Sequence, residues 1–163
     1  MMSKCKRVPA LWWLAAVLLL AIPGRAQTAE FAVITNTRNP AQTVTTTRLR
    51  RLFRGDERFW SEKVPVFLII RESGSSERAF VLAKIYNQSE AEYKQGWNAK
   101  VFRGEAATGP TEVPSNGLAS GLVGSQIGGL TVLPAANIPK DGSVKVLKID
   151  GKLPGEPGYP LKW

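Results

Sequence analysis

The residues best suited to chemistry in this sequence form one short run of an arginine and three serines. Arg71 is followed by Ser73, Gly74, Ser75 and Ser76. The planar guanidinium of an arginine donates paired hydrogen bonds to phosphate or carboxylate, and serine hydroxyls donate further bonds without adding charge. The run therefore predicts a binding site for phosphate or a similar oxyanion at these five residues.

Two apolar segments on either side of this run would position it. Residues 64–71 are mostly branched and apolar up to Arg71, which is typical of a strand buried on both faces of a parallel sheet. Residues 79–86 are long and apolar enough for a helix. Ligands of open α/β sheets bind outside the carboxyl ends of the strands, and the free N–H groups and dipole at a helix start favour anions. The turn between the two segments is thus the expected anion cradle.

A second interpretation of the same turn needs no ligand. Ser75 or Ser76, with Glu77 or Glu90 nearby, could simply cap the helix, because serine is among the best N-cap residues. Gly74 would then only supply a turn. Capping and anion binding compete for the same N–H groups, and the sequence leaves both interpretations open.

The composition excludes several classes of enzyme. Beyond residue 26 the sequence contains no His and no Cys, so neither a Ser-His-Asp triad nor a Cys-His pair can form there. Most zinc sites need the same residues. The spacing suggests neither a Ser-Lys mechanism nor a carboxylate pair. We expect a protein that is not an enzyme and that carries no cofactor or metal.

The first 26 residues are typical of a secretory signal peptide. Lys4, Lys6 and Arg7 precede an apolar run from Ala10 to Ile22, which is shorter than the roughly 20 residues needed to span a bilayer. A small-residue cleavage site follows at residues 24–26. We therefore expect a leader at residues 1–26 and one exported domain at residues 27–163, located in the periplasm.

The charge balance of the expected domain is modestly positive. It contains 18 basic and 13 acidic residues, which gives +5. This excess suits anionic ligands, anionic lipid or cell-wall polymers, and it is too small to indicate nucleic-acid binding. Four arginines fall within seven residues and form either a solvated helix face or a surface for a polyanion or partner: Arg48, Arg50, Arg51 and Arg54.

The remaining pattern predicts a small α/β domain with a largely parallel sheet flanked by helices. Strands are expected at residues 31–35, 128–133 and 143–150, the last at a sheet edge. A helix capped by Thr45, Thr46 or Thr47 would end at Gly55, and a polar loop with a small lid would occupy residues 56–63.

Two further helices complete the prediction. A capping box at Ser89 opens the first, in which Tyr93, Trp97 and Val101 form an apolar stripe expected to face the core. Residues 115–124 are expected to form a second, closely packed helix, with Leu118 and Leu122 at helical spacing.

The ordered set of these motifs resembles the phosphate-binding-protein-like family, the substrate-binding components of phosphate ABC transporters. The resemblance covers nearly the whole expected domain: Asn39 and Pro40, Leu49 to Gly55, Trp60, Val64 and Pro65, Arg71 to Ser75, Phe80, Gly128 to Pro134, Val144 to Leu147, and Tyr159 to Leu161. It implies one lobe of a type II periplasmic binding protein, because two-lobed family members are roughly twice as long.

The resemblance assigns the anion contacts to Arg71, Gly74 and Ser75. This chain departs from the family pattern at Ser73, where an acidic residue is usual, and at Ser76 and Glu77, where Gly and Thr are usual. A carboxylate at Glu77 would repel phosphate unless it points away. Two or three charge-assisted hydrogen bonds in an open lobe imply only ~mM affinity.

Two functions follow as hypotheses. In the first, the protein is a periplasmic solute-binding-like domain that binds phosphate or a similar oxyanion in phosphate ABC transport, with a homodimer as one way to rebuild a cleft. In the second, it is an envelope adaptor or sensor domain that binds a protein partner, such as a transporter or sensor ectodomain, through the retained fold.

Overall fold

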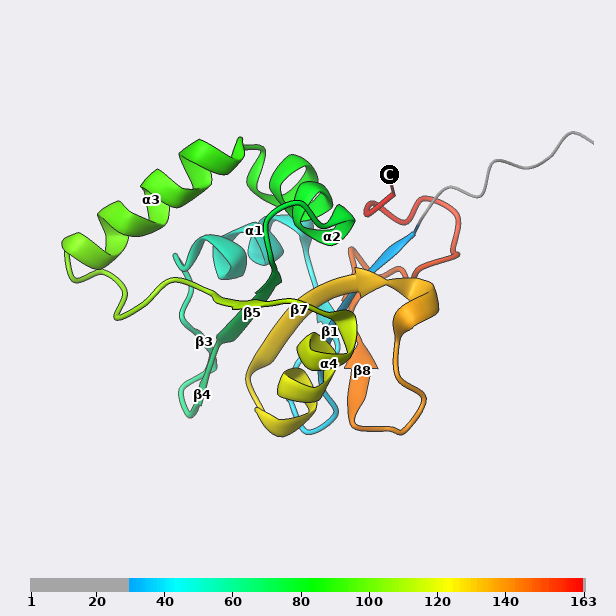
Figure 1. Ribbon diagram of the computed structural model, residues 1–163. Helices are drawn as coiled ribbons and strands as arrows, with labels where there is room; N and C mark the ends of the chain where they lie inside the picture. Colours follow the sequence, from blue (N-terminus) through cyan, green and yellow to red (C-terminus); the bar gives the residue numbers. More distant parts are fainter. Residues whose placement is uncertain (1–29, 163) are drawn as a thin grey trace, which may run out of the picture.

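The computed structural model describes residues 30–162 and shows one five-stranded sheet with helices on both faces (Figure 1). The predicted leader at residues 1–26 lies outside the described residues. The strand order is β6-β5-β7-β1-β8, formed by β6 (Thr111–Val113), β5 (Phe67–Arg71), β7 (Gly129–Pro134), β1 (Phe31–Asn36) and β8 (Val144–Val146).

The sheet is mostly parallel, as the sequence predicts. β5 pairs in parallel with β6 and with β7, while β1 runs antiparallel to both β7 and β8. Four of the five strands therefore share one direction, and β1 is the exception. β5 lies between two parallel partners, which explains its continuous apolar run.

Two layers of helix cover the two faces of the sheet. α1 (Thr46–Arg54), α2 (Ser76–Phe80) with the π-helical turn η1 (Val81–Tyr86), and α3 (Glu90–Phe102) lie on one side, and α4 (Asn116–Ser125) lies on the other (Figure 1). Alternation along β1 sends Phe31 and Val33 into the first apolar cluster and Ala32 and Ile34 into the second.

The shorter elements frame this core. β2 (Thr43–Val44) pairs in parallel with β9 (Lys148–Ile149), and η2 (Ala135–Asn137) follows β7. The predicted strand at residues 143–150 is thus divided into β8, at the predicted sheet edge, and β9. Within residues 30–162, no helix combines the length and apolar character needed to cross a membrane.

Several predicted helix ends are confirmed. Thr45 caps α1 by accepting from the Arg48 N–H, and Gly55 ends it in the left-handed conformation with φ of 71°. Ser89 and Glu92 form the predicted capping box of α3.

Two of the predicted apolar stripes differ from the structure. Tyr93 is buried and Trp97 half-buried, but Val101 is exposed because the end of α3 extends beyond the sheet. In α4 the residues that reach the core are Ala119 and Val123, and Leu118 is exposed. The glycine-rich sequence of α4 allows small residues to bring the helix close to the sheet.

The predicted polar loop at residues 56–63 instead contains a hairpin. β3 (Phe59–Ser61) pairs with β4 (Val64–Pro65), so the central strand begins only at Phe67. Trp60 is buried and its indole Nε1 donates to the Gly128 carbonyl at 3.0 Å. The hairpin is fixed to the sheet by this contact.

We expect Gly128→Ala to destabilise the fold severely. A Cβ at position 128 would lie 1.7 Å from the backbone oxygen of Pro65, so the hairpin and β7 would have to separate. The expected loss is about 3 kcal/mol or more in the free energy of unfolding, measured by chemical denaturation.

Gly121→Ala is the matched control, because a Cβ there meets nothing within 4 Å and alanine favours the helix. Equal stability of the two variants would contradict the close packing of β4 against Gly128.

Candidate functional site

Two strand–turn–helix units open at the same edge of the sheet. β5 and β6 are parallel, with Arg71 opposite Val113, so the turns that follow them lie side by side. Each turn ends in a serine N-cap: Ser75 accepts from the Arg78 N–H at 3.2 Å, and Ser115 accepts from the Leu118 N–H at 3.1 Å. The first turns of α2 and α4 thus meet at the carboxyl ends of two strands, where an α/β sheet binds ligands.

Arg71 lies at the predicted place, at the end of β5. Its side chain is 12% exposed, its Nη1 donates to the Val113 carbonyl at 3.0 Å, and its Nε is buried without a hydrogen-bond partner. Gly74, with φ of 89°, forms the turn beyond it. One buried donor of the predicted anion-binding fork is therefore free.

A carboxylate of the chain itself occupies the space beside Arg71. The side chain of Glu77 is 8% exposed, and its Oε2 lies 3.8 Å from Arg71 Nε and 3.3 Å from the Ser76 hydroxyl. Its Oε1 accepts from Asn116 Nδ2 of α4 at 2.7 Å. Glu77 therefore points into the cradle and contacts the first turns of both helices.

The protonation of Glu77 reflects two opposing causes. Burial raises the pKa of its carboxyl, but the hydrogen bond from Asn116 and the charge of Arg71 outweigh burial and lower the pKa overall. The group is thus a carboxylate at neutral pH, and a bound anion would meet its negative charge.

The predicted serines divide between different partners. Ser75 caps α2, as the ligand-free interpretation expects, and its hydroxyl donates to the Glu72 carbonyl at 2.8 Å. The Ser76 hydroxyl faces Glu77. The Ser73 hydroxyl donates to Glu90 at 2.7 Å, on α3. Arg71, Gly74, Ser75 and Ser76 are therefore gathered around the cradle, while the Ser73 hydroxyl is turned toward α3.

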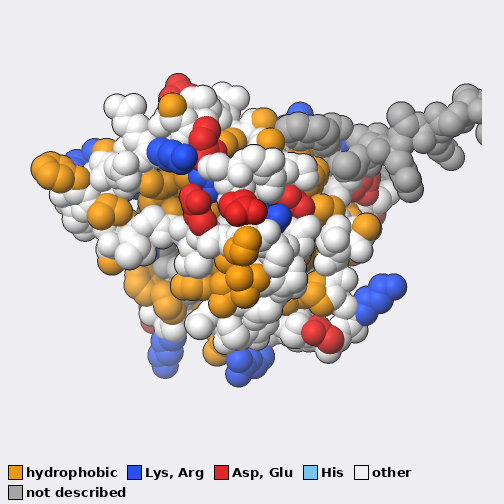
Figure 2. Space-filling model, in the orientation of Figure 1, with side chains coloured by type: hydrophobic (Ala, Val, Ile, Leu, Met, Phe, Trp, Pro, Cys, Tyr) orange, Lys and Arg blue, Asp and Glu red, His pale blue; other side chains and the backbone are white. Residues whose placement is uncertain are grey.

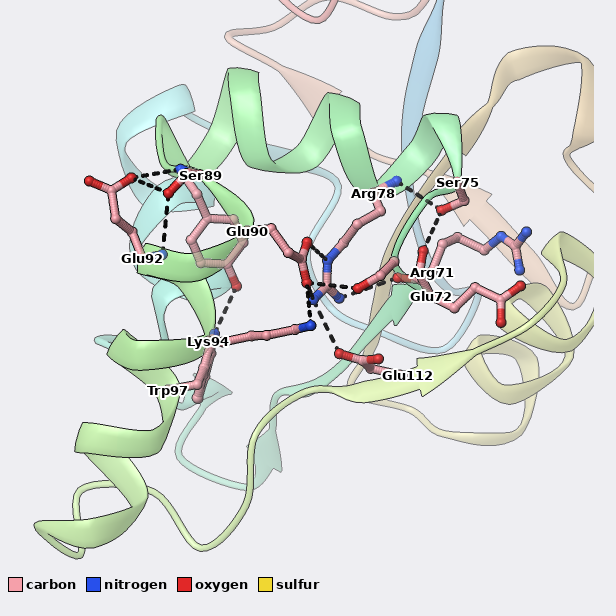
Figure 3. A network of polar contacts seen from close by, with 12 residues as sticks. Arg71, Glu72, Ser75, Arg78, Ser89, Glu90, Glu92, Lys94, Trp97 and Glu112 are labelled. Carbon is pink, nitrogen blue, oxygen red and sulfur yellow. Dashed lines mark hydrogen bonds and ion pairs between the residues drawn. The ribbon is translucent and has the colours of Figure 1, made fainter.

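A buried arginine holds the walls of the cradle together. Arg78 of α2 is 1% exposed, and its guanidinium binds Glu90 of α3 at 2.8 Å and 3.1 Å and Glu112 of β6 at 3.1 Å (Figure 3). It also donates to the Arg71 carbonyl at 3.3 Å and stacks on the Tyr93 ring at 4.2 Å. These contacts join α2, α3, β5 and β6.

The rim of the cradle is acidic. In the view of Figure 2, acidic side chains gather across the middle of the face toward which the carboxyl end of β5 opens. Glu72 and Glu112 are exposed there, and Lys94 of α3 approaches Glu90 at 3.4 Å. The hydrogen bond from Arg78 lowers the pKa of Glu90 to about 2.

The arginine-rich face of α1 is largely paired within the chain. Arg48 and Arg51 each approach Glu57 at 2.8 Å, and Arg54 donates to the Tyr86 carbonyl at 3.1 Å. This pairing leaves less free charge for a polyanion than the sequence alone suggests.

The sequence interpretation missed the contribution of the second unit. Residues 111–116 repeat the pattern of an extended apolar segment followed by a serine cap, which is the signal that could have identified Asn116. The role of Arg78 left no such signal, because a single arginine in a helix is normally exposed. Among residues 30–162, no group of His, Cys, Asp or Glu could hold a metal ion.

Comparison with known proteins places the fold. No protein-family model and no curated protein matches the sequence. Solved structures do match, among them a candidate phosphate ABC transporter substrate-binding protein with bound phosphate from Clostridium perfringens, at TM-score 0.60 and 20% identity over 76% of this chain and 46% of that one.

Two further structures show the same likeness. An ABC-type phosphate transport receptor from Vibrio cholerae has TM-score 0.61 and 16% identity over 77% of this chain and 48% of its own. PstS from Borrelia burgdorferi has TM-score 0.62 and 14% identity over 82% and 54%. The chain therefore has the fold of a lobe of these binding proteins, as the sequence resemblance implies, and spans about half of their length.

We expect Glu90→Gln to lower the free energy of unfolding by about 1 kcal/mol at neutral pH, because charge-assisted bonds to Arg78 are lost and the carboxylate is partly exposed. The folded pKa of about 2 lies below the ordinary value, so the contribution is present above about pH 5 and lost as the pH falls toward 2. Denaturation of both proteins at pH 7 and pH 2.5 measures this.

Glu105→Gln, which removes an exposed partner of Arg103, is the control and should change stability by less than about 0.5 kcal/mol. A stability difference between Glu90→Gln and the parent protein that is the same at both pH values would argue against the assignment.

Proposed function

We propose that the protein is a periplasmic solute-binding-like lobe that binds phosphate or a similar oxyanion at Arg71, Ser73, Gly74, Ser75 and Ser76, in association with phosphate ABC transport. The carrying observation is the pair of buried polar atoms left without partners on either side of the Glu77 carboxylate. These are the donor Arg71 Nε and the acceptor Asn116 Oδ1. Buried polar atoms normally find a partner, so an unpaired donor and acceptor in one cradle point to a ligand.

The chemistry of the two free atoms favours a protonated oxyanion. Hydrogen phosphate both accepts hydrogen bonds and donates one, and can therefore satisfy Arg71 Nε and Asn116 Oδ1 together. Fully ionised sulfate has no proton to donate. The likeness to phosphate-binding structures supports the same class of ligand.

Glu77 competes with such a ligand. Its carboxylate already contacts the donors that an anion would use, and two negative charges within about 4 Å repel each other by several kcal/mol at a protein surface. The anion therefore binds only as Glu77 moves aside or is neutralised. Weak, ~mM binding is the expected result for the native lobe.

The same observation supports a second candidate function. A cradle that holds its own carboxylate, in a chain of about half the length of its structural neighbours, suits an envelope adaptor or sensor domain. Its ligand would then be a transporter or sensor ectodomain, bound through the retained fold. Absence of phosphate binding in both the native protein and a Glu77 variant would favour this role.

We expect Arg71→Ala to weaken phosphate binding at least tenfold while the protein remains folded, because the charged fork is removed but only one hydrogen bond, to Val113, is lost. Isothermal titration of the protein purified from the periplasm, at low ionic strength, measures this. Arg50→Ala removes an equal charge from an exposed position of α1 and should leave the affinity unchanged. Unaltered binding by Arg71→Ala would remove the cradle from consideration.

We expect Glu77→Gln to strengthen phosphate binding by about tenfold, since it removes the competing charge and keeps the size of the side chain. The same titration applies. Glu62→Gln, in the β3–β4 turn, makes an equal change in net charge and serves as the control. Weaker binding by Glu77→Gln than by the native protein would show that Glu77 assists the ligand.

A further inference from the structure

We propose that a groove at the opposite end of the sheet binds a small organic anion with an apolar body. The groove has a volume of about 440 Å³ and lies between the β3–β4 hairpin and the loop from α4 to β7. β5 and β7 begin at this end, whereas the cradle lies where β5 finishes. The proposal is thus independent of the oxyanion site.

The walls of the groove carry an excess of positive charge. Arg38, from the loop after β1, and Lys63, from the β3–β4 turn, both line it. Both side chains are exposed, and no carboxylate is among the lining residues. Within residues 30–162, neither charged group makes an ion pair or a side-chain hydrogen bond, whereas most other cations of this chain are paired. Two free cations that face one groove suit the head group of an anion.

The floor of the groove is apolar. Val64, Val66 and Phe67 line it, and Ile127 is 40% exposed beside them. An anion without an apolar part would leave this surface in water. A ligand with a carboxylate or phosphate head and a short hydrocarbon body would cover it and pair with the cations at the same time.

The groove is built on rigid structure. Trp60 Nε1 bonds to the Gly128 carbonyl, and the Phe67 N–H donates to the same carbonyl at 2.9 Å. Gly128 lies so close to Pro65 that no side chain fits there. The floor is therefore fixed before a ligand arrives, which lowers the entropic cost of binding.

The concave shape favours a small ligand over a membrane surface. Figure 2 shows basic side chains projecting from the lower end of the molecule, where Figure 1 places the β3–β4 hairpin. A flat lipid surface would contact these projecting groups but would leave the groove between them unfilled. Its volume instead lies within the range of about 300–1,000 Å³ that is usual for small-molecule sites.

Sodium octanoate is the probe, added to the ¹⁵N-labelled protein purified from the periplasm. We expect saturable shifts of the backbone amides of Val64, Val66, Phe67 and Ile127. Acetate, with the same head group, and octylammonium, with the same chain, should not reproduce them. Arg38→Gln and Lys63→Gln should each weaken binding about three- to fivefold. Lys148→Gln, an exposed cation elsewhere, and Arg71→Ala should not.

Three outcomes would overturn the proposal. The first is octanoate shifts that centre on another surface. The second is equal binding of octylammonium, or of octanoate by the doubly neutralised variant. The third is sedimentation with phosphatidylglycerol vesicles that depends on Arg38 and Lys63 without any octanoate binding, which would assign the groove to a lipid surface.

Discussion

The buried guanidinium of Arg78 is the interaction on which the geometry of the cradle depends. A charge that is 1% exposed must be compensated inside the protein, and here Glu90, Glu112, the Arg71 carbonyl and the Tyr93 ring supply the compensation. Because these partners belong to separate elements, α2 can keep its place only if α3 and β6 keep theirs. The turn that carries the serines is therefore held rigidly at the end of β5.

The same geometry explains why an internal carboxylate is tolerated beside Arg71. Two helix starts and an arginine create a positive field at one sheet edge, and a buried carboxylate at that point is stabilised by it. Glu77 uses this field in the structure. Any oxyanion must use the same field, so binding is an exchange of one anion for another and not an addition to an empty site.

The overall fold could be predicted because its signals are local. The apolar run before Arg71, the caps at Thr45, Ser75 and Ser89, and the glycine at position 55 each act within a few residues. The mistakes arose where tertiary contacts decide. The hairpin at residues 59–65 depends on Trp60 reaching Gly128, 68 residues away, and no local pattern shows that contact.

The candidate site was predictable only in part, for a related reason. Arg71 and the serines lie in one turn and could be recognised together. Asn116 comes from a turn about 40 residues later, which the parallel pairing of β5 with β6 brings alongside. The turning of Ser73 toward Glu90 likewise follows from the position of α3. Sequence spacing identified the residue types, whereas sheet register decided which of them meet.

The length of the chain bears on which anion chemistry survives. In a two-lobed binding protein the second lobe can exclude water and add donors, which strengthens every charged hydrogen bond. This chain spans about half of such a protein, so its cradle faces solvent unless a partner or second copy covers it. An exposed arginine cradle is weak toward free anions, and Glu77 weakens it further. Selection for tight capture of phosphate by the lobe alone would be expected to remove that carboxylate, so its presence indicates that the physiological ligand arrives with additional contacts of its own.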